Sequence, residues 1–596
     1  MCGIFGYVGK QNNASQIVLE GLKLLEYRGY DSWGIAAKIK DERLKMKDFI
    51  VEKHIGKIGN ALLNSQLSTP NSQLSIGHTR WATHGGVTVK NAHPHLDCTK
   101  TIAVVHNGIV ENFQELKTEL IKKGHRFISE TDTEIIPHLV EENLKKEGFA
   151  TSVRDAFNEL KGMNAIVVMN AVSNEIIAAK NGSPLVVGVG KNEFFIASDA
   201  SGIVKYTRKV IFIKDNEMAI LGKNIQILSL PKGKKLRINY ETVNWEPEDA
   251  DKGKYKHFMI KEIYDQPKVI YNIAENYGDQ IENFAKIIKD ARGTFFIGAG
   301  TAYYACIGGA YLFSTVANKH VNVVVASEFN YLENFLNRES LVIALSQSGE
   351  TIDVVEPITR AKQKKSTVAA ITNTLGSSLY RLADHKILLG AGPEKAVAST
   401  KAYTAKLSLL LFLAFSLAGR NKEGKKLLVQ TDREIRRILD KKNIEKIKKL
   451  ADKLCRIDHI YTLGRGLSYS TALEAALKIK EVSYIHAEGF AGGELKHGTL
   501  ALISEGTPCI IFAPIDETYE AIISNAIEIK ARGGFVIGIS PKRARVFDYW
   551  IKINDLKQAS LIAQIIPAQL LGYFIAIKKG YDPDKPRNLA KSVTVK

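Results

Sequence analysis

Residues 295–313 read FFIGAGTAYYACIGGAYLF: an apolar run, a glycine turn, and a longer stretch with helical spacing. The same order returns at 460–481 as IYTLGRGLSYSTALEAALKIKE, with Gly464 lying 166 positions after Gly298. Apolar strands that alternate with helices are typical of parallel sheets covered on both faces. We therefore predict a duplicated α/β unit, forming two tandem doubly wound domains at 275–425 and 426–596.

The front of the chain has a different pattern. Residues 1–240 contain short strand-like runs separated by Gly, Asn and Asp, including CGIFGYVG, TIAVVHNG and NAIVVMNAV. This pattern predicts antiparallel sheets of an α+β domain, with helices near 16–26 and 111–123. The hydrophobic periodicity lapses around 241–258, so we assign 241–274 to a linker and a lead-in helix.

Composition restricts the class of protein. A chain of 596 residues with 45% hydrophobic residues should form several domains with large buried cores. The net charge of +19 comes from scattered lysine pairs without zinc-finger spacing or an RNA-binding aromatic signature, so we expect no nucleic-acid partner. The apolar run at 407–419 is too short to cross a membrane, and no leader precedes Cys2. The five cysteines form no pairs, which indicates a reducing cytoplasm.

Cys2 is a candidate nucleophile. Once Met1 is removed, the residue carries a thiol and an α-amine whose pKa of roughly 7.7–8 lets it act as a general base. The alternative is a small residue that merely permits methionine removal.

Three further motifs in the front half fit chemistry on an amino acid. Asn107 and Gly108 follow an apolar run and can face an oxyanion, although Asn-Gly is also a common turn. Arg80, beside Trp81 and Thr83, suits a carboxylate, and Asp132 suits an ammonium group. Taken singly, Arg80 could be a surface ion-pair partner and Asp132 could cap a helix.

The second half carries groups suited to a phosphosugar. LSQSGET (345–351) places hydroxyls where a helix should begin, which favours phosphate binding but also fits a plain helix cap. In the expected helix 471–485, Glu474, Lys478 and Glu481 share one face. They could form a solvent-exposed ladder of salt bridges or serve as acid–base groups in catalysis. The apolar end of the chain should pack and bury Lys591.

We expect neither a metal nor another cofactor. His93-Pro-His95 lacks further ligands at a useful spacing and fits a loop. The Gly-x-Gly pair at 298–300 does not continue into a dinucleotide fingerprint, so NAD is not expected.

The chain resembles known families over essentially its whole length. The front half is similar to the N-terminal-nucleophile domain of class II glutamine amidotransferases, and the second half to sugar isomerase (SIS) domains. Together they resemble the isomerising glutamine–fructose-6-phosphate aminotransferase family. The motifs that carry the first resemblance are MCGIFGYVG (1–9), EYRGYDSWG (26–34), HTRWATHG (78–85), NAHPH (91–95), HNGIVEN (106–112) and SETDTE (129–134).

The resemblance implies an αββα glutaminase sandwich followed by two SIS domains. Cys2 would attack the glutamine amide, and Asn107 and Gly108 would form the oxyanion hole. Trp81 would gate the passage of ammonia, which needs an apolar route to avoid protonation. Glutamine would be held by Arg80, Thr83, His84 and Asp132.

For the second half, the resemblance implies conversion of fructose 6-phosphate to glucosamine 6-phosphate, the first step of amino-sugar synthesis. Glu481 would transfer the C1–C2 proton with Lys478 nearby, His497 from a neighbouring subunit would open the ring, and Lys591 would form an imine. At least a homodimer is therefore implied. The sugar phosphate would be held by Thr301, Ser346, Gln347, Ser348, Thr351, Val397, Ala398 and Ser399.

Two alternatives remain, and one position departs from the family pattern. Another class II amidotransferase would keep the Cys2 domain without SIS repeats, and a phosphosugar-binding regulator would keep the repeats without the catalytic front. The resemblance places Ala302 where bacterial members carry a substrate-contacting serine, so one hydrogen bond to the ligand should be missing.

Overall fold

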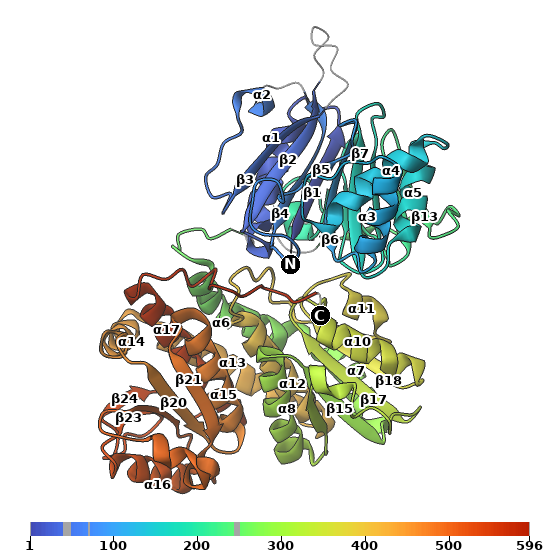
Figure 1. Ribbon diagram of the computed structural model, residues 1–596. Coiled ribbons are helices and arrows are strands. Elements are labelled where there is room, and N and C mark those ends of the chain that lie inside the picture. The colour runs from blue at the N-terminus through green and yellow to red at the C-terminus, as the bar shows by residue number, and fades with distance from the viewer. Residues whose placement is uncertain (1, 40–48, 69–71, 244–250, 595–596) are drawn as a thin grey trace. The chain divides into compact units, whose positions relative to one another are not determined.

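The protein is described by a computed structural model that covers residues 2–39, 49–68, 72–243 and 251–594 (Figure 1). Its internal contacts divide the chain into two compact units. Unit 1 comprises Met1–Asp251 with Ala590–Lys596, and unit 2 comprises Lys252–Leu589. Residues 244–250 of the expected linker lie outside the described residues.

Unit 1 is built mainly from antiparallel strands. In chain order its elements are β1 (Gly3–Gly9), α1 (Ala14–Leu25), η1 (Glu26–Arg28), β2 (Ser32–Ile39), β3 (Ile50–Ile55), α2 (Ser65–Ser68), β4 (Ser72–Arg80), β5 (His95–Leu96), β6 (Ile102–Gly108), α3 (Phe113–Lys122), η2 (Asp132–Glu134), α4 (Ile135–Leu144), α5 (Phe149–Glu159), β7 (Asn164–Asn170), β8 (Ile176–Lys180), β9 (Val186–Val189), β10 (Glu193–Ala197), η3 (Ala200–Gly202), β11 (Lys209–Phe212), β12 (Glu217–Leu221), β13 (Ile225–Ser229) and β14 (Glu241–Thr242).

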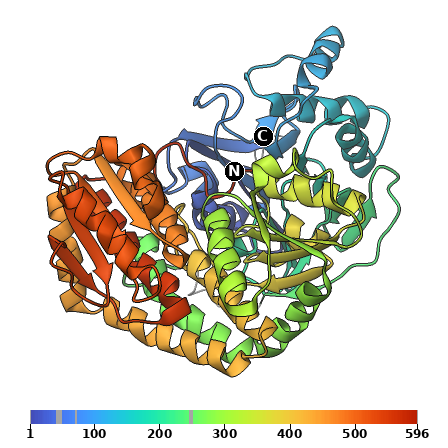
Figure 2. The ribbon, with the colours of Figure 1, turned by 90° about the horizontal axis from the view of Figure 1, so that it is seen from below.

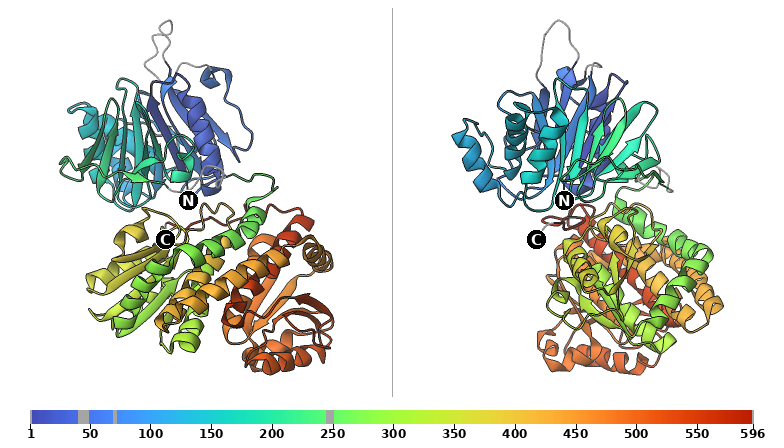
Figure 3. Two further views of the ribbon diagram at one scale, coloured as in Figure 1. Left: turned by 180° about the vertical axis from the view of Figure 1, so that it is seen from behind. Right: turned by 90° about the vertical axis from the view of Figure 1, so that its right-hand side faces the viewer.

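These elements form an αββα sandwich, which confirms the expected fold. One sheet has the order β14-β11-β9-β10-β1-β4-β2-β3 and the other β13-β12-β8-β7-β6-β5. Figure 1 shows α1 outside the first sheet and α3, α4 and α5 outside the second, and Figure 3 shows the sheets face to face. Alternation produces the layers: Ile4 and Val8 of β1 face the other sheet, whereas Phe5 and Tyr7 pack under α1.

Unit 2 consists of helices around two parallel sheets. Its elements are α6 (Phe258–Asn276), α7 (Gly278–Asp290), β15 (Gly293–Gly298), α8 (Thr301–Ala317), β16 (Asn322–Val325), α9 (Ala326–Phe329), β17 (Ser340–Ser346), α10 (Ile352–Gln363), β18 (Thr367–Thr372), α11 (Ser378–Leu382), β19 (His385–Leu388), α12 (Lys401–Leu417), α13 (Asn421–Ile438), α14 (Lys441–Leu454), β20 (His459–Gly464), α15 (Leu467–Ser483), β21 (His486–Ala491), η5 (Gly492–His497), η6 (Thr499–Leu502), β22 (Pro508–Phe512), α16 (Tyr519–Lys530), β23 (Phe535–Ser540), β24 (Tyr549–Lys552), η7 (Lys557–Ala559) and α17 (Ser560–Lys578).

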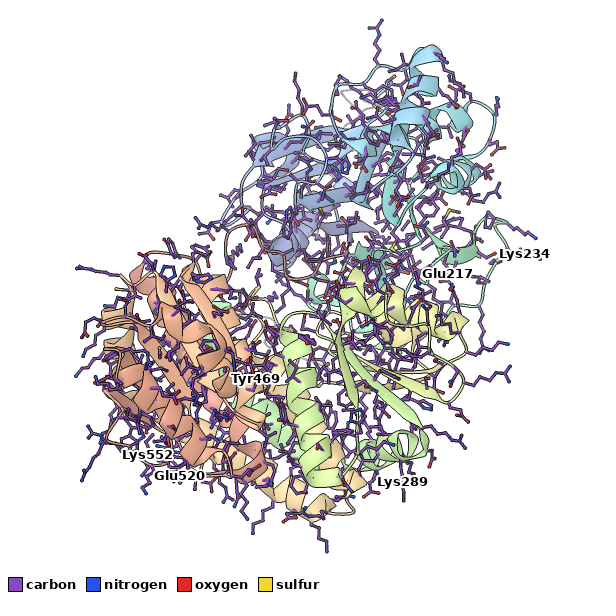
Figure 4. All side chains as sticks on the ribbon, turned by 60° about the horizontal axis from the view of Figure 1, so that its bottom comes forward. Glu217, Lys234, Lys289, Tyr469, Glu520 and Lys552 are labelled. Carbon is purple, nitrogen blue, oxygen red and sulfur yellow. The ribbon has the colours of Figure 1, made fainter. Side chains whose placement is uncertain are left out.

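The predicted duplication is confirmed in the backbone. The sheet orders β16-β15-β17-β18-β19 and β21-β20-β22-β23-β24 are equivalent, and every pairing in both is parallel. Gly300 and Gly466 precede matching helices with nearly the same angles, φ 51° and 52°. Figure 2 shows the first repeat in green and yellow and the second in orange and red. In Figure 4, Tyr469 of α15 lies near α8, which packs against α15.

Helix α17 lies within the most apolar long segment of unit 2. Lys557–Lys578 has a mean hydropathy of 1.7 and is long enough to cross a membrane. The shorter apolar run at 407–419 forms most of α12. In the structure 89% of the most apolar window of Lys557–Lys578 is buried, and α17 packs on α15 and α14. We therefore assign it to the core of unit 2.

Four buried histidines lie behind the ends of β4 and β6 in unit 1. His78 stacks on His93 with ring centroids 4.1 Å apart, and His93 meets the ring of His95 edge-on. His106 bonds Thr133 Oγ1 and Asn164 Oδ1, both at 2.9 Å. The sequence analysis placed His93 and His95 in a loop, but both are buried and His95 begins β5.

Burial keeps these rings neutral. It lowers the pKa of His78 to about 3, those of His93 and His95 well below the ordinary value, and that of His106 in the same direction. Arg80 and the imidazole of His106 further lower the pKa of His78. A neutral histidine core is therefore part of this unit's stability.

We predict that unit 1 is destabilised by acid in the range where these histidines would ionise on unfolding. A folded pKa below the unfolded value of 6.5 means that the unfolded chain binds more protons from pH 6.5 down to about 3. His78 alone should cost up to roughly 1.4 kcal/mol per pH unit in that window. Urea unfolding between pH 7 and pH 4.5 should therefore show a smaller pH dependence for His78→Gln. The exposed His320→Gln should keep the wild-type dependence, and equal slopes for all three proteins would contradict the prediction.

Candidate functional site

Strand register places Cys2 at one edge of the sandwich of unit 1. Gly3 of β1 pairs with Thr79 of β4, so Cys2 lies beside Arg80 where β4 ends. The Trp81 backbone N–H donates to the Cys2 Sγ at 3.2 Å, and Arg28 Nε donates to the Cys2 carbonyl at 3.1 Å. The thiol is only partly buried, so a ligand can reach it.

Asn107, at the end of β6 in the opposite sheet, faces Cys2. Its Nδ2 donates to the Cys2 carbonyl at 3.1 Å and to Ser198 Oγ at 2.9 Å. His78 Nε2 lies 3.0 Å from both Asn107 Oδ1 and the His106 carbonyl. Because both of those atoms are acceptors, His78 Nε2 carries the proton, and the Asn107 amide is fixed with its N–H groups toward Cys2.

Gly108 cannot be replaced by a residue with a side chain at this place. Its φ is 135°, and a Cβ there would lie 2.2 Å from the Met163 carbonyl oxygen. The structure therefore brings Cys2, Asn107 and Gly108 together, as the sequence analysis expected.

The residues expected to hold an amino acid surround this edge. Arg80 donates to the carbonyls of Gly85 and Gly86, both at 3.1 Å, so it also organises the loop after β4. Burial lowers the pKa of Arg80. Asp132 is buried and accepts the Val110 N–H at 2.8 Å. Thr83 is exposed, and Trp81 and His84 are half-buried.

Three polar residues of the site were not singled out from the sequence. Arg28 lies 3.5 Å from Asp199, and Ser198 accepts the Ile4 N–H at 2.8 Å. Asp31 accepts the Ala82 N–H at 2.9 Å. Arg28 and Asp31 belong to the motif EYRGYDSWG (26–34), which could have pointed to them. Ser198 follows a strand, and no motif in the sequence pointed to it.

In unit 2, the hydroxyl-rich loop lies where the strand order of the first sheet reverses. Ligands of doubly wound folds bind at this point, beyond the carboxyl ends of the strands. Ser346 ends β17 and its Oγ accepts the Gly349 N–H at 2.9 Å. Ser348 Oγ accepts the Glu350 N–H and lies 3.5 Å from Thr351 Oγ1. The loop is folded around the start of α10, with Gln347 half-buried.

The segment 397–399 comes just before α12. Val397 and Ala398 are buried, and the Val397 N–H donates to the Asp584 carbonyl at 3.0 Å. Ser399 Oγ donates to Glu394 Oε2 at 2.9 Å. Ala302, on the first turn of α8, is buried with 7% exposure.

Glu474, Lys478 and Glu481 share one face of α15, as predicted. The interpretation of this face as a solvent-exposed salt-bridge ladder is wrong. Glu474 and Lys478 have no exposed surface, and Lys478 Nζ lies 3.5 Å from Glu474 Oε1 and contacts Glu481. Thr301 Oγ1 donates to Glu474 Oε1 at 3.3 Å, which links the two repeats. Burial raises the pKa of Glu474, whereas the two carboxylates outweigh burial and raise that of Lys478.

Two further residues were expected in this site, His497 and Lys591. His497 is exposed at the end of η5, and among the described residues it has no hydrogen bond to Glu481 or Lys478. Lys591 is half-buried rather than buried, and its segment groups with unit 1.

Comparisons with known proteins agree with this architecture. A model described as SIS domain matches residues 287–416 and 453–572, and a model described as glutamine amidotransferase domain matches 78–205. A solved C-terminal domain of glucosamine-fructose-6-phosphate aminotransferase from Francisella tularensis is 32% identical, with a TM-score of 0.52. It covers 56% of this chain and 100% of that one.

Full-length relatives carry a single name. Proteins of Pyrococcus horikoshii and Thermococcus kodakarensis, both called glutamine–fructose-6-phosphate aminotransferase (isomerising), are 43% and 42% identical, and the matches cover 100% of this chain and of each relative. The chain therefore belongs to the family of isomerising glutamine–fructose-6-phosphate aminotransferases.

Proposed function

We propose that this chain uses glutamine to convert fructose 6-phosphate to glucosamine 6-phosphate and releases glutamate. The observation that carries the proposal is that one chain holds both the Cys2–Asn107 edge of unit 1 and the hydroxyl loop with the α15 cluster of unit 2. A different amidotransferase would not need the hydroxyl loop and the α15 cluster. A regulator that only binds sugar phosphates would not need the Cys2–Asn107 edge.

In unit 1, the Cys2 thiolate attacks the side-chain amide carbon of glutamine. The α-amine of Cys2 takes the thiol proton and passes it to the departing ammonia, and water then hydrolyses the thioester to glutamate. The Gly108 N–H and Asn107 Nδ2 stabilise the oxyanion. For this, the Asn107 N–H that donates to the Cys2 carbonyl exchanges that bond for one to the oxyanion, while His78 keeps the amide in its orientation. Arg80 and Asp132 hold the α-carboxylate and α-ammonium groups, with Thr83 and His84 beside them and Trp81 gating ammonia.

In unit 2, the sugar phosphate binds at the start of α10. Ser346, Ser348 and Thr351 offer hydroxyls there, and the first backbone N–H groups of a 12-residue helix add donors and a positive dipole end. Gln347, Thr301 and the segment 397–399 contact the phosphate or the sugar. Ser399 must exchange its bond to Glu394 for one to the ligand.

The chemistry on the sugar uses groups of α15 and the tail. Glu481 is the partly exposed member of the α15 cluster and contacts Lys478, so it moves the proton between C1 and C2. Lys591 forms an imine with the open-chain ketose. The exposed His497 opens the sugar ring in a neighbouring copy of the chain, so the active form is a homodimer. The enzyme acts in the cytoplasm.

The direct test is to incubate the pure protein with glutamine and fructose 6-phosphate and to identify the products. Glucosamine 6-phosphate and glutamate should appear in equal amounts, and mass spectrometry should show a mature chain that begins at Cys2. Cys2→Ala should abolish both products yet retain slow isomerisation of fructose 6-phosphate to glucose 6-phosphate. Cys455→Ser is the matched control and should behave as wild type. An aminated product from Cys2→Ala with glutamine, or none from wild type, would refute the proposal.

The α15 cluster gives a second prediction, for Glu481→Gln. Removing a proton-transfer carboxylate costs about 10²–10⁴-fold in rate, so isomerisation should fall by at least about 100-fold while glutamine hydrolysis persists. Glu445 forms the same i,i+3 pair with Lys448 on the surface of α14 and is the matched control. Glu445→Gln should leave both rates unchanged, and a similar loss in both variants would point to general destabilisation.

A third prediction concerns Ala302. A serine there adds a hydroxyl on the first turn of α8, next to Thr301. Hydrogen bonds to charged groups are worth about 1.5–3 kcal/mol, although a bridging water recovers part of that. Ala302→Ser should therefore tighten fructose 6-phosphate binding by up to about tenfold, or ~1.4 kcal/mol, in calorimetric titration. Ala310→Ser on the same helix should have no effect. Unchanged or weaker binding by Ala302→Ser would show that this position does not face the ligand.

A further inference from the structure

Four side chains converge in unit 1 outside the Cys2 edge. Cys98 lies in the turn between β5 and β6, His125 follows α3, and His138 and Glu141 occupy successive turns of α4. One ligand atom from each lies within 4.8 Å of every other. We propose that these four residues bind a zinc ion, at a site that the sequence motifs do not indicate.

Four of the six spacings among these atoms are close to those of a tetrahedral zinc site, and all six are within 4.8 Å. Zn–S and Zn–N bonds of about 2.3 and 2.0–2.1 Å put neighbouring ligand atoms roughly 3.3–3.6 Å apart. Cys98 Sγ lies 3.7 Å from His125 Nδ1 and 3.6 Å from His138 Nδ1. Glu141 Oε2 lies 3.0 and 3.4 Å from the same two nitrogens. A single cation at the centre can therefore reach all four with little movement.

The outer nitrogens of both imidazoles face carboxylates. His125 Nε2 lies 3.1 Å from Glu142 Oε2, and the buried His138 Nε2 lies 4.0 Å from Glu134 Oε1. Metal-bound histidines usually donate their second N–H to such a group, which fixes the ring and raises its basicity. The Arg126 N–H points to Cys98 Sγ at 3.4 Å, and the Cys98 N–H donates to Glu141 Oε2 at 3.2 Å. These contacts hold the Cys98 sulfur and the Glu141 carboxylate in place beside the two imidazoles.

The donor set selects the metal class. One thiolate, two imidazoles and one carboxylate suit Zn²⁺, whereas Mg²⁺ and Ca²⁺ take oxygen ligands. All four tetrahedral positions come from the protein, which is the pattern of a structural rather than a catalytic zinc site.

The site would brace the segments that carry the Cys2 edge. The turn at Cys98 leads into β6, which ends at Asn107 and Gly108, and the loop after His125 leads to Asp132. Figure 1 shows α3 and α4 side by side on one face of the sandwich, and they pack together. The proposal does not depend on the chemistry proposed for Cys2, because metal content can be measured directly.

The test is the metal content of the untagged full-length protein. After incubation with zinc and exhaustive dialysis, elemental analysis should find one zinc per chain in wild type and none in Cys98→Ser. Because Cys98 is exposed, its replacement by serine should not prevent folding. The matched control Cys455→Ser should retain the metal. Zinc absent from wild type, or retained equally by Cys98→Ser, would overturn the proposal.

Cobalt provides a readout of the ligands themselves. The Co²⁺-loaded wild type should show a thiolate-to-metal charge-transfer band and the visible absorption of tetrahedral Co²⁺. Cys98→Ser should lose the charge-transfer band, and His138→Gln should lose the tetrahedral absorption. A wild-type spectrum of octahedral Co²⁺ without the thiolate band would contradict the assignment.

Discussion

The side-chain amide of Asn107 joins the two sheets of unit 1, and the candidate glutaminase site depends on it. A buried amide has to satisfy both of its ends, because an unpaired polar atom costs about 1–3 kcal/mol. Here Nδ2 reaches Cys2 and Ser198, while Oδ1 accepts from His78. His78 can serve only as a neutral ring with its proton on Nε2, so the histidine core behind it also fixes the orientation of the amide.

The same constraint shapes unit 2. Glu474 and Lys478 have no exposed surface, and removing one partner of such a pair would leave an uncompensated buried charge. The bond from Thr301 to Glu474 ties the first turn of α8 to α15, so the glycine turn of one repeat is held by a carboxylate of the other. Both candidate sites are therefore built from buried polar groups whose partners lie far apart in the sequence.

This separation of partners along the sequence explains which features could be predicted from the sequence and which could not. Local periodicity was sufficient for antiparallel sheets in the front half, the doubly wound layers, the duplication, and the common face of Glu474, Lys478 and Glu481. The αββα sandwich was expected only from the family resemblance. Periodicity did not reveal that the face of Glu474, Lys478 and Glu481 is buried, because burial depends on α8 and α17 packing against α15. The cluster of Cys98, His125 and the α4 ligands was missed for the same reason: its members come from three segments without motif spacing. The longer apolar stretch Lys557–Lys578 was not recognised from the sequence.

The two repeats also show why a chain with duplicated folds need not have duplicated sites. In the first repeat, Ser348 and Thr351 surround the start of α10, and Glu350 turns inward to accept the Ser378 N–H at 2.9 Å. In the second, the equivalent loop places Asp516 and an exposed Glu517 before α16, and the Thr518 hydroxyl donates to Asp516 at 2.6 Å. Two carboxyl groups at that helix start repel a phosphate, and the one hydroxyl is already engaged. The second repeat thus keeps the turn geometry and contributes the α15 cluster, while the hydroxyl-rich loop proposed to bind phosphate belongs to the first repeat.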